Sequence, residues 1–317
     1  MIITKTPFRI SFFGGGTDFK EFYEKEEGAV LSTTINKGVY NILNYNPIIR
    51  VSHSQGTEIV NSVDEIKHRL IKACLKFMKI ETGVQIDSQS PLRGTGLGSS
   101  SSYAVGLLNA LHSLKGEIVS AEILAREACI VERKILGEPG GKQDQYMAAH
   151  GGFRFIEFMP DETVKLEYLF FNKEELLKNL MLFNTGVTRD SVLIQSEVRK
   201  KLEENREILR KMREFAYEAK NLLKSSRFDE FGRLLHKNWE LKKKISLLAS
   251  TEVLNSQYQK AIDAGALGGK ILGAGGGGFF LFYVPEQKQE KVRNALNNLK
   301  EVKFDFEPLG SRIVYVD

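Results

Sequence analysis

The residues best suited to chemistry begin with a glycine-rich segment, residues 91–102, which reads PLRGTGLGSSSS. Glycines at alternate positions let main-chain N–H groups approach a ligand closely. The serines begin a predicted helix, whose first N–H groups have no partner within it and favour an anion. The segment therefore predicts a phosphate-binding loop. A glycine turn followed by an ordinary serine helix cap is the alternative that the residues leave open.

This loop differs from the two best-known nucleotide-binding motifs. It does not end in Gly-Lys-Ser/Thr, as a Walker A loop does, and it does not match the GxGxxG pattern of dinucleotide-binding folds. Ordinary P-loop and Rossmann folds are therefore disfavoured.

Two further glycine-rich segments adjoin apolar stretches. Residues 14–18 read GGGTD and follow a predicted strand at 10–13, whereas residues 268–278 read GGKILGAGGGG and precede another strand. A carboxylate beside a hydroxyl suits hydrogen bonding to sugar hydroxyls, although Thr-Asp after glycine is also a common turn with a helix cap. Four consecutive glycines are entropically costly, so we expect close approach of the main chain to a ligand or another domain, rather than a flexible linker.

Two acidic residues lie between these segments. Glu132 is on a predicted helix, and Asp144 is in the glycine-rich turn that ends it. Phosphoryl transfer needs phosphates held by main-chain N–H groups, Mg²⁺ held by a carboxylate and a hydroxyl, and a group that orients or deprotonates the acceptor. The loop, Glu132 with Ser100, and Asp144 can fill these roles. Spacing alone does not establish them, because an acidic residue on a helix is commonly only solvated.

A mixed set of elements must position these residues. Apolar periodicity predicts strands at residues 10–13, 39–44, 48–53, 84–88, 279–284 and 311–316. It predicts helices at 64–78, 99–114, 120–136, 253–264 and 286–299, and a strongly helical stretch at 190–249. Composition changes near residue 170. We therefore predict an α+β fold in two domains, residues 1–172 and 173–317.

Composition narrows the class of protein. The 317 residues are 42% apolar and 27% charged, as is usual for a globular protein. No stretch approaches the roughly 18 apolar residues of a membrane span, and the start lacks a signal-peptide layout, so we expect a cytoplasmic protein without membrane partners. The basic residues of 197–244 alternate with glutamates at helical spacing, which indicates a solvated helix face and not a nucleic-acid surface. Cys74 and Cys129 are expected as buried thiols.

The three glycine segments together resemble those of the GHMP kinases, the superfamily that includes galactokinase, homoserine kinase, mevalonate kinase and phosphomevalonate kinase. Residues 6–18 look like the first motif, residues 91–102 like the phosphate loop and residues 270–278 like the third motif. The resemblance covers most of the chain. It implies an N-terminal domain like ribosomal protein S5 domain 2 and a ferredoxin-like C-terminal domain, with ATP and substrate in the cleft between them.

The resemblance also implies roles for the residues that match. Asp144 matches the catalytic aspartate of galactokinase and Arg9 the arginine near the transferred phosphoryl group, while Ser100 and Glu132 are implied as Mg²⁺ ligands. The implied ATP-binding residues are Gly94, Gly96, Leu97, Gly98, Ser99, Ser100 and Ser101. The implied substrate-binding residues are Gly15, Gly16, Thr17, Asp18, Gly141, Lys142, Gly275 and Gly276.

A narrower resemblance concerns the substrate. Galactokinase has Gly-Glu-His-Thr-Asp where this chain has GGGTD, which argues against galactose. Together with residues 28–37, 139–145 and 238–244, this motif is similar to D-glycero-D-manno-heptose 7-phosphate kinases, with L-fucokinase as a neighbour. The implied reaction phosphorylates the anomeric hydroxyl of the heptose 7-phosphate to the 1,7-bisphosphate, for GDP-heptose and surface polysaccharide.

Several alternatives stay open. A kinase of another sugar, such as L-fucose, and a catalytically inactive sugar-binding sensor are the two rivals, and an isoprenoid or amino-acid-pathway kinase is disfavoured. The predicted partner is a sugar or sugar phosphate, and a homodimer is an open possibility for the assembly. A substrate phosphate needs a basic anchor, for which the sequence offers Lys37, Arg93, Lys142 and Arg189 without choosing among them.

Overall fold

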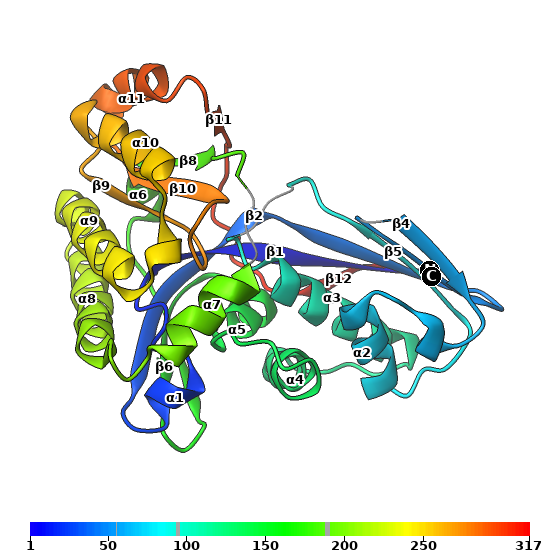
Figure 1. Ribbon diagram of the computed structural model, residues 1–317. Coiled ribbons are helices and arrows are strands. Elements are labelled where there is room, and N and C mark those ends of the chain that lie inside the picture. The colour runs from blue at the N-terminus through cyan, green and yellow to red at the C-terminus, as the bar shows by residue number, and fades with distance from the viewer. Residues whose placement is uncertain (55, 93–95, 188–190) are drawn as a thin grey trace.

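The computed structural model describes residues 1–54, 56–92, 96–187 and 191–317 and contains two sheets (Figure 1). The first sheet has the strand order β12-β1-β2-β5-β3-β4, and β6 adds to β2 and β7 to β6. Its strands are β1 (Ile2–Phe13), β2 (Gly28–Tyr45), β3 (Ile49–His53), β4 (Gly56–Val60), β5 (Val84–Gln89), β6 (Phe153–Phe158), β7 (Val164–Tyr168) and β12 (Arg312–Val316). The second sheet has the order β11-β8-β10-β9 and is antiparallel. Its strands are β8 (Leu180–Asn184), β9 (Gly268–Ile271), β10 (Phe279–Tyr283) and β11 (Lys300–Glu301).

The helices of the first half cover one face of the first sheet. They are α1 (Lys20–Tyr23), α2 (Arg69–Phe77), α3 (Ser99–Leu114), α4 (Ala121–Cys129) and α5 (Gln143–His150). Apolar residues recur every three or four positions along α3, including Ala104, Leu107, Leu108 and Leu111, and all four are buried. These residues pack with α2, α4 and α5 against strands of the first sheet. This packing fixes α3, whose N-terminus directly follows the phosphate loop.

The second half of the chain supplies further helices, several of which pack against the sheets. They are α6 (Lys173–Lys178), α7 (Ser191–Lys200), α8 (Arg206–Lys224), α9 (Phe228–Ile245), α10 (Glu252–Asp263) and α11 (Gln289–Ala295). The apolar stripe of α8 joins phenylalanines of β1 in one core, to which Phe231 of α9 contributes by edge-to-face ring contacts. Helices α10 and α11 lie beside the second sheet (Figure 1). Because α8 and α9 share a core with β1, both halves of the chain are held around one cleft.

The α+β prediction is confirmed, and most elements lie where periodicity predicts them. The helix predicted at 99–114 has these bounds, whereas the helix predicted at 64–78 begins at Arg69, after the 3₁₀ turn η1 (Val63–Glu65). The stretch predicted at 120–136 ends in a π-helical turn, η2 (Ile130–Ile135), and the helical stretch at 190–249 consists mainly of α7, α8 and α9.

The chain ends in the first sheet. Strand β12 pairs antiparallel with β1, and the N–H of Asp317 donates to the carbonyl of Met1 at 3.0 Å. The division into residues 1–172 and 173–317 stays a prediction, and in that division β12 would belong to the second segment although it lies in the first sheet. Cys74 and Cys129 are buried free thiols. None of the helices in the described part of the chain is long and apolar enough to cross a membrane.

Candidate active site

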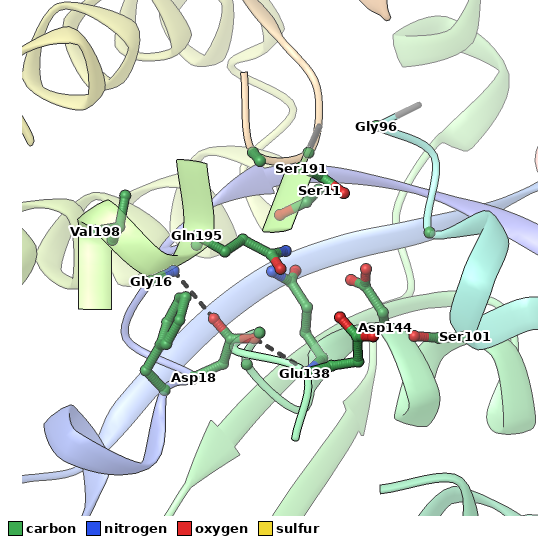
Figure 2. Close-up of a pocket in the computed structure, with 18 of the residues that line it drawn as sticks. Ser11, Gly16, Asp18, Gly96, Ser101, Glu138, Asp144, Ser191, Gln195 and Val198 are labelled. Carbon is green, nitrogen blue, oxygen red and sulfur yellow. Dashed lines mark hydrogen bonds between the residues drawn. The ribbon is translucent and has the colours of Figure 1, made fainter. Parts of the chain in front are cut away.

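A cleft of about 340 Å³ opens where the three glycine segments meet (Figure 2). One wall comes from the end of β1, the start of α3, the π-helical turn η2 and the turn before α5. The opposite wall comes from α7, α8, α9 and residues 273–274. Residues distant in sequence therefore converge on one concave site, as is typical of small-molecule enzymes.

The described part of the phosphate loop is fixed by contact with the third glycine segment. Gly96 and Gly98 have φ of +101° and +71°, which favours glycine at both positions. A Cβ on Gly96 would lie 2.7 Å from the carbonyl oxygen of Leu272, and a Cβ on Gly273 would lie 2.4 Å from the Cα of Gly96. The two main chains can approach this closely only because neither residue carries a side chain. Gly98 then leads directly into α3, whose first turn lines the cleft.

An arginine and a carboxylate form a two-bond pair beside this loop. Nε and Nη2 of Arg9 donate to Oδ1 and Oδ2 of Asp144, each at 2.7 Å, and Nη1 donates to the carbonyl of Gly96 at 2.5 Å. The Arg9 side chain is 6% exposed and that of Asp144 is 21% exposed, so the carboxylate keeps access to the cleft. Bidentate pairing fixes orientation as well as distance. Asp144 is therefore held in place relative to the phosphate loop.

A second carboxylate is held by the loop serines. Oγ of Ser100 donates to Oε1 of Glu132 at 2.9 Å, and Nε2 of Gln145 donates to Oε2 at 2.6 Å. Burial raises the pKa of Glu132, while bonds from Ser101, Gln145 and Ser100 oppose that rise. Glu132 lies on the π-helical turn η2, a distortion that is frequent at functional sites. A carboxylate with a hydroxyl suits Mg²⁺, which usually keeps water and phosphate oxygens as its other ligands.

Asp18 is fixed at the other end of the same wall. The N–H of Gly16 donates to Oδ1 at 3.0 Å, and the N–H of Gln143 donates to Oδ2 at 3.2 Å (Figure 2). Burial is the largest influence on this carboxyl and raises its pKa. A Cβ on Gly141 would lie 1.8 Å from Oδ2, so the turn needs glycine there. Each carboxylate oxygen retains acceptor capacity for a ligand hydroxyl.

The residues of the opposite wall were not predicted from the sequence. Ser191, Gln195 and Val198 of α7 lie across the cleft from Asp18 and Asp144 (Figure 2), and buried Leu209 and Met212 of α8 complete an apolar surface. The apolar residues of each helix recur at ordinary helical spacing. This spacing indicates that one face of the helix is buried, but not which part of the protein that face contacts.

Two lysines near this wall were also missed. The Lys270 amine donates to the carbonyls of Ser11 and Phe12 at 2.8 and 2.9 Å, and burial lowers its pKa well below the ordinary value. The Lys242 amine donates to the carbonyl of Ile271 at 3.3 Å and to that of Gly273. Burial, and then the charge of Arg9, lower the pKa of Lys242 to about 7.

Comparison with known proteins decides the family. The models for the GHMP kinases N terminal domain and the GHMP kinases C terminal match residues 68–152 and 219–301. A D-glycero-alpha-D-manno-heptose 7-phosphate kinase of Campylobacter jejuni is 30% identical, over 96% of this chain and 96% of that protein. The chain belongs to the GHMP kinase family. This protein is therefore a kinase, a phosphotransferase with an alcohol acceptor.

Other relatives agree with this assignment. The crystal structure of a D-glycero-D-manno-heptose 1-phosphate kinase from Bacteroides thetaiotaomicron superposes with a TM-score of 0.82 at 27% identity, covering 100% of both chains. A bifunctional fucokinase/GDP-fucose pyrophosphorylase of Arabidopsis thaliana is 26% identical over 93% of this chain and 31% of that protein. The predicted two-domain GHMP kinase fold is confirmed.

The structure brings most predicted site residues of this GHMP kinase to the cleft. Those that line it are Arg9, Gly15, Gly16, Asp18, Gly96, Gly98, Ser99, Ser100, Ser101, Glu132, Gly141 and Asp144. Gly94 and the candidate anchors Arg93 and Arg189 lie outside the described residues. Lys37, another candidate anchor, does not line the cleft.

Five predicted ligand-binding residues are not in the cleft lining: Thr17, Leu97, Lys142, Gly275 and Gly276. The Thr17 hydroxyl donates to the main chain at Gly14 and Ala29, and Leu97 is buried in the apolar core. The Lys142 ammonium pairs with Glu162 and lies 4.6 Å from the ring centre of Tyr23. The N–H of Gly276 donates to the carbonyl of Ala249 at 2.7 Å. A direct ligand contact of these five residues therefore stays a prediction.

Proposed function

We propose that this GHMP kinase transfers the terminal phosphate of ATP to the anomeric hydroxyl of D-glycero-D-manno-heptose 7-phosphate, giving the 1,7-bisphosphate for GDP-heptose and surface polysaccharide. The proposed substrate rests on one observation: the heptose 7-phosphate kinase of Campylobacter jejuni is 30% identical to this chain along nearly the whole of both proteins. The absence of side chains at Gly15 and Gly16 is compatible with a sugar larger than a hexose, because both residues line the cleft beside Asp18.

In the proposed reaction, Asp144 orients the acceptor hydroxyl and takes its proton as the new O–P bond forms and the bond to the leaving ADP breaks. Arg9 holds both oxygens of Asp144 and so fixes the direction from which the carboxylate approaches the hydroxyl. Asp18 accepts hydrogen bonds from sugar hydroxyls and positions the ring. Bound Mg·ATP supplies the electrophilic phosphoryl group.

The residues that would hold the nucleotide and metal fit these groups. Gly96 lets the loop lie against the main chain of Leu272, and Gly98 leads into α3, whose first N–H groups have no partner within the helix and would favour a phosphate. Ser100 and Glu132 would hold Mg²⁺, and the described residues contain no cluster of three or more His, Cys, Asp or Glu that could replace them. We expect ATP phosphates to supply the remaining charge at this site.

The test is turnover of a substrate panel. The purified protein is incubated with Mg·ATP and D-glycero-D-manno-heptose 7-phosphate, L-fucose, galactose or mannose, and ADP release is followed while ³¹P NMR locates the new phosphate. A new anomeric phosphate on the heptose 7-phosphate alone supports the proposal. Turnover of L-fucose alone would replace the heptose with the substrate that the fucokinase relative suggests.

The sequence also left open an inactive sugar-binding sensor, which membership of a kinase family now disfavours. This alternative predicts tight binding of the sugar without ADP release. The intact Arg9–Asp144 pair and the Ser100–Glu132 bond oppose it, because a sensor has no need to keep both arrangements.

A further inference from the structure

Two cations that line the cleft, Lys242 and Lys270, have no carboxylate partner among the described residues. Arg9 pairs with Asp144, and the charge of Arg133 acts on the carboxyls of Asp18 and Glu132. The half-buried Lys242 differs from both, because the charged group that acts on it is another cation, Arg9. Across residues 1–54, 56–92, 96–187 and 191–317, its amine bonds only to main-chain carbonyls.

The position of this amine points to the phosphate end of the cleft. Lys242 donates to the carbonyl of Gly273, and Gly273 is the residue that touches Gly96 of the phosphate loop. The carbonyl of Gly96 in turn accepts from Arg9 at 2.5 Å. The ammonium, the guanidinium and the two glycine segments therefore meet at one place.

The bonding of Lys242 leaves capacity for a ligand. A protonated amine has three N–H donors, and two of them are used by the carbonyls of Ile271 and Gly273. The Asp144 carboxylate balances the charge of Arg9, whereas the neutral carbonyls leave the charge of Lys242 unbalanced. Lys270 is a third basic residue nearby. It is only 3% exposed, and both hydrogen bonds of its amine join β9 to β1. An anion in the cleft would balance this group of bases.

We propose that Lys242 donates a hydrogen bond to a phosphate oxygen of the ligand bound in the cleft. Two ligands of the proposed function carry such a group: the terminal phosphate of the nucleotide and the phosphate of the sugar. The contact between Gly273 and Gly96 favours the nucleotide, because it places the amine against the phosphate loop. The nucleotide part of this inference rests on ATP as the phosphoryl donor but not on the identity of the sugar.

The decisive measurement compares nucleotides with and without the terminal phosphate. Calorimetry gives the Kd of Mg·ADP and of a non-hydrolysable Mg·ATP analogue for wild type, Lys242→Met and Lys242→Gln. A charge-assisted hydrogen bond of about 1.5–3 kcal/mol corresponds to a loss of roughly 10–100-fold. Both variants should lose about tenfold or more in affinity for the analogue while Mg·ADP binding changes by less than about twofold.

Lys243→Met is the matched control. Lys243 is the next residue on α9, but its ammonium pairs with Glu240 at 2.7 Å and it does not line the cleft. This control should bind both nucleotides as wild type does. Lys242→Gln guards against misfolding, since its amide can still donate to the carbonyls of Ile271 and Gly273.

The sugar arm uses the same variants. A raised KM for a sugar phosphate, with unchanged KM for an unphosphorylated sugar and unchanged nucleotide binding, would assign the contact to the sugar phosphate. Unchanged behaviour with all ligands overturns the proposal. Equal loss of ADP and analogue binding with a lowered melting temperature also overturns it, because Lys242 would then only support the fold. Failure of the wild type to phosphorylate the heptose phosphate would remove the proposed substrate but leave the nucleotide comparison intact.

Discussion

The two walls of the cleft are built in different ways. The wall from the first half of the chain is here termed the carboxylate wall. On it, Arg9 bonds to Asp144 and Ser100 bonds to Glu132, each through side chains. On the wall from α7, α8 and α9, termed the helical wall, the lining is largely apolar and Lys242 bonds only to main-chain carbonyls among the described residues. The carboxylate wall is thus ordered before any ligand binds, whereas the helical wall offers surface and charge that a ligand must complete.

This difference suits the carboxylate wall to catalysis and the helical wall to ligand binding. Groups that act on the reacting atoms need fixed geometry, since small displacements reduce the rate strongly. Groups that recognise a phosphate or cover a sugar ring need only be available when the ligand arrives. Changes on the carboxylate wall should therefore lower kcat, and changes on the helical wall should act mainly on binding.

The largest expected effect is on the carboxylate wall. Asp144→Asn should lower kcat by roughly two orders of magnitude or more, the contribution typical of a general base, because an amide cannot take the proton of the acceptor. ATP binding should stay nearly intact, since Asp144 contacts Arg9 and not the phosphate loop. Steady-state kinetics with calorimetry checks both. An unchanged kcat would remove Asp144 from the mechanism and abolish the distinction between the walls.

The second effect concerns the metal. Glu132→Gln should raise the Mg²⁺ concentration needed for half-maximal rate by about 10–100-fold, because the carboxylate charge at the Ser100 hydroxyl is lost. Burial raises the pKa of Glu132, so the ionised carboxylate is itself a cost to the fold. The melting temperature without Mg²⁺ should therefore be unchanged or higher. Normal metal dependence would contradict the assigned role.

The carboxylate wall could largely be predicted from the sequence, and the helical wall could not. The glycine loop with Gly96 is a local pattern, and the resemblance to the GHMP kinases implies roles for Ser100 and Asp144, so all three could be named without the fold. Lys242 lies in a run of three lysines that looks like a solvated helix face, and only the packing of α9 against β9 buries its amine. Lys142 shows the opposite case: it lies in a predicted substrate motif, but its ammonium pairs with Glu162 and it does not line the cleft.

The third effect tests the contact that joins the walls. Gly96→Ala would place a Cβ 2.7 Å from the Leu272 carbonyl at a φ of +101°. We expect ATP affinity to fall about tenfold or more, because the loop must move away from the third glycine segment.

Gly116→Ala is the control: its φ is +73°, and nothing lies within 4 Å of the added Cβ. It should cost roughly 1–2 kcal/mol of folding free energy and leave ATP binding unchanged. Equal ATP affinities would show that the contact does not hold the phosphate loop.

The smallest effect is a pH dependence that belongs to the helical wall. The pKa of Lys242 is lowered to about 7 by burial and by the charge of Arg9, whose own partner is Asp144, while Lys270 is the other basic group nearby. The folded amine is therefore charged below pH 7 and loses its charge as the pH rises through that value. If the charge binds phosphate, kcat/KM for ATP should fall by up to about fivefold between pH 7 and 8 and go on falling at higher pH until it reaches the value of Lys242→Met. Lys242→Arg, which stays protonated, should flatten this limb of the profile. A decline of the same size and midpoint in Lys242→Arg would assign it to another group and leave Lys242 without a titrating role.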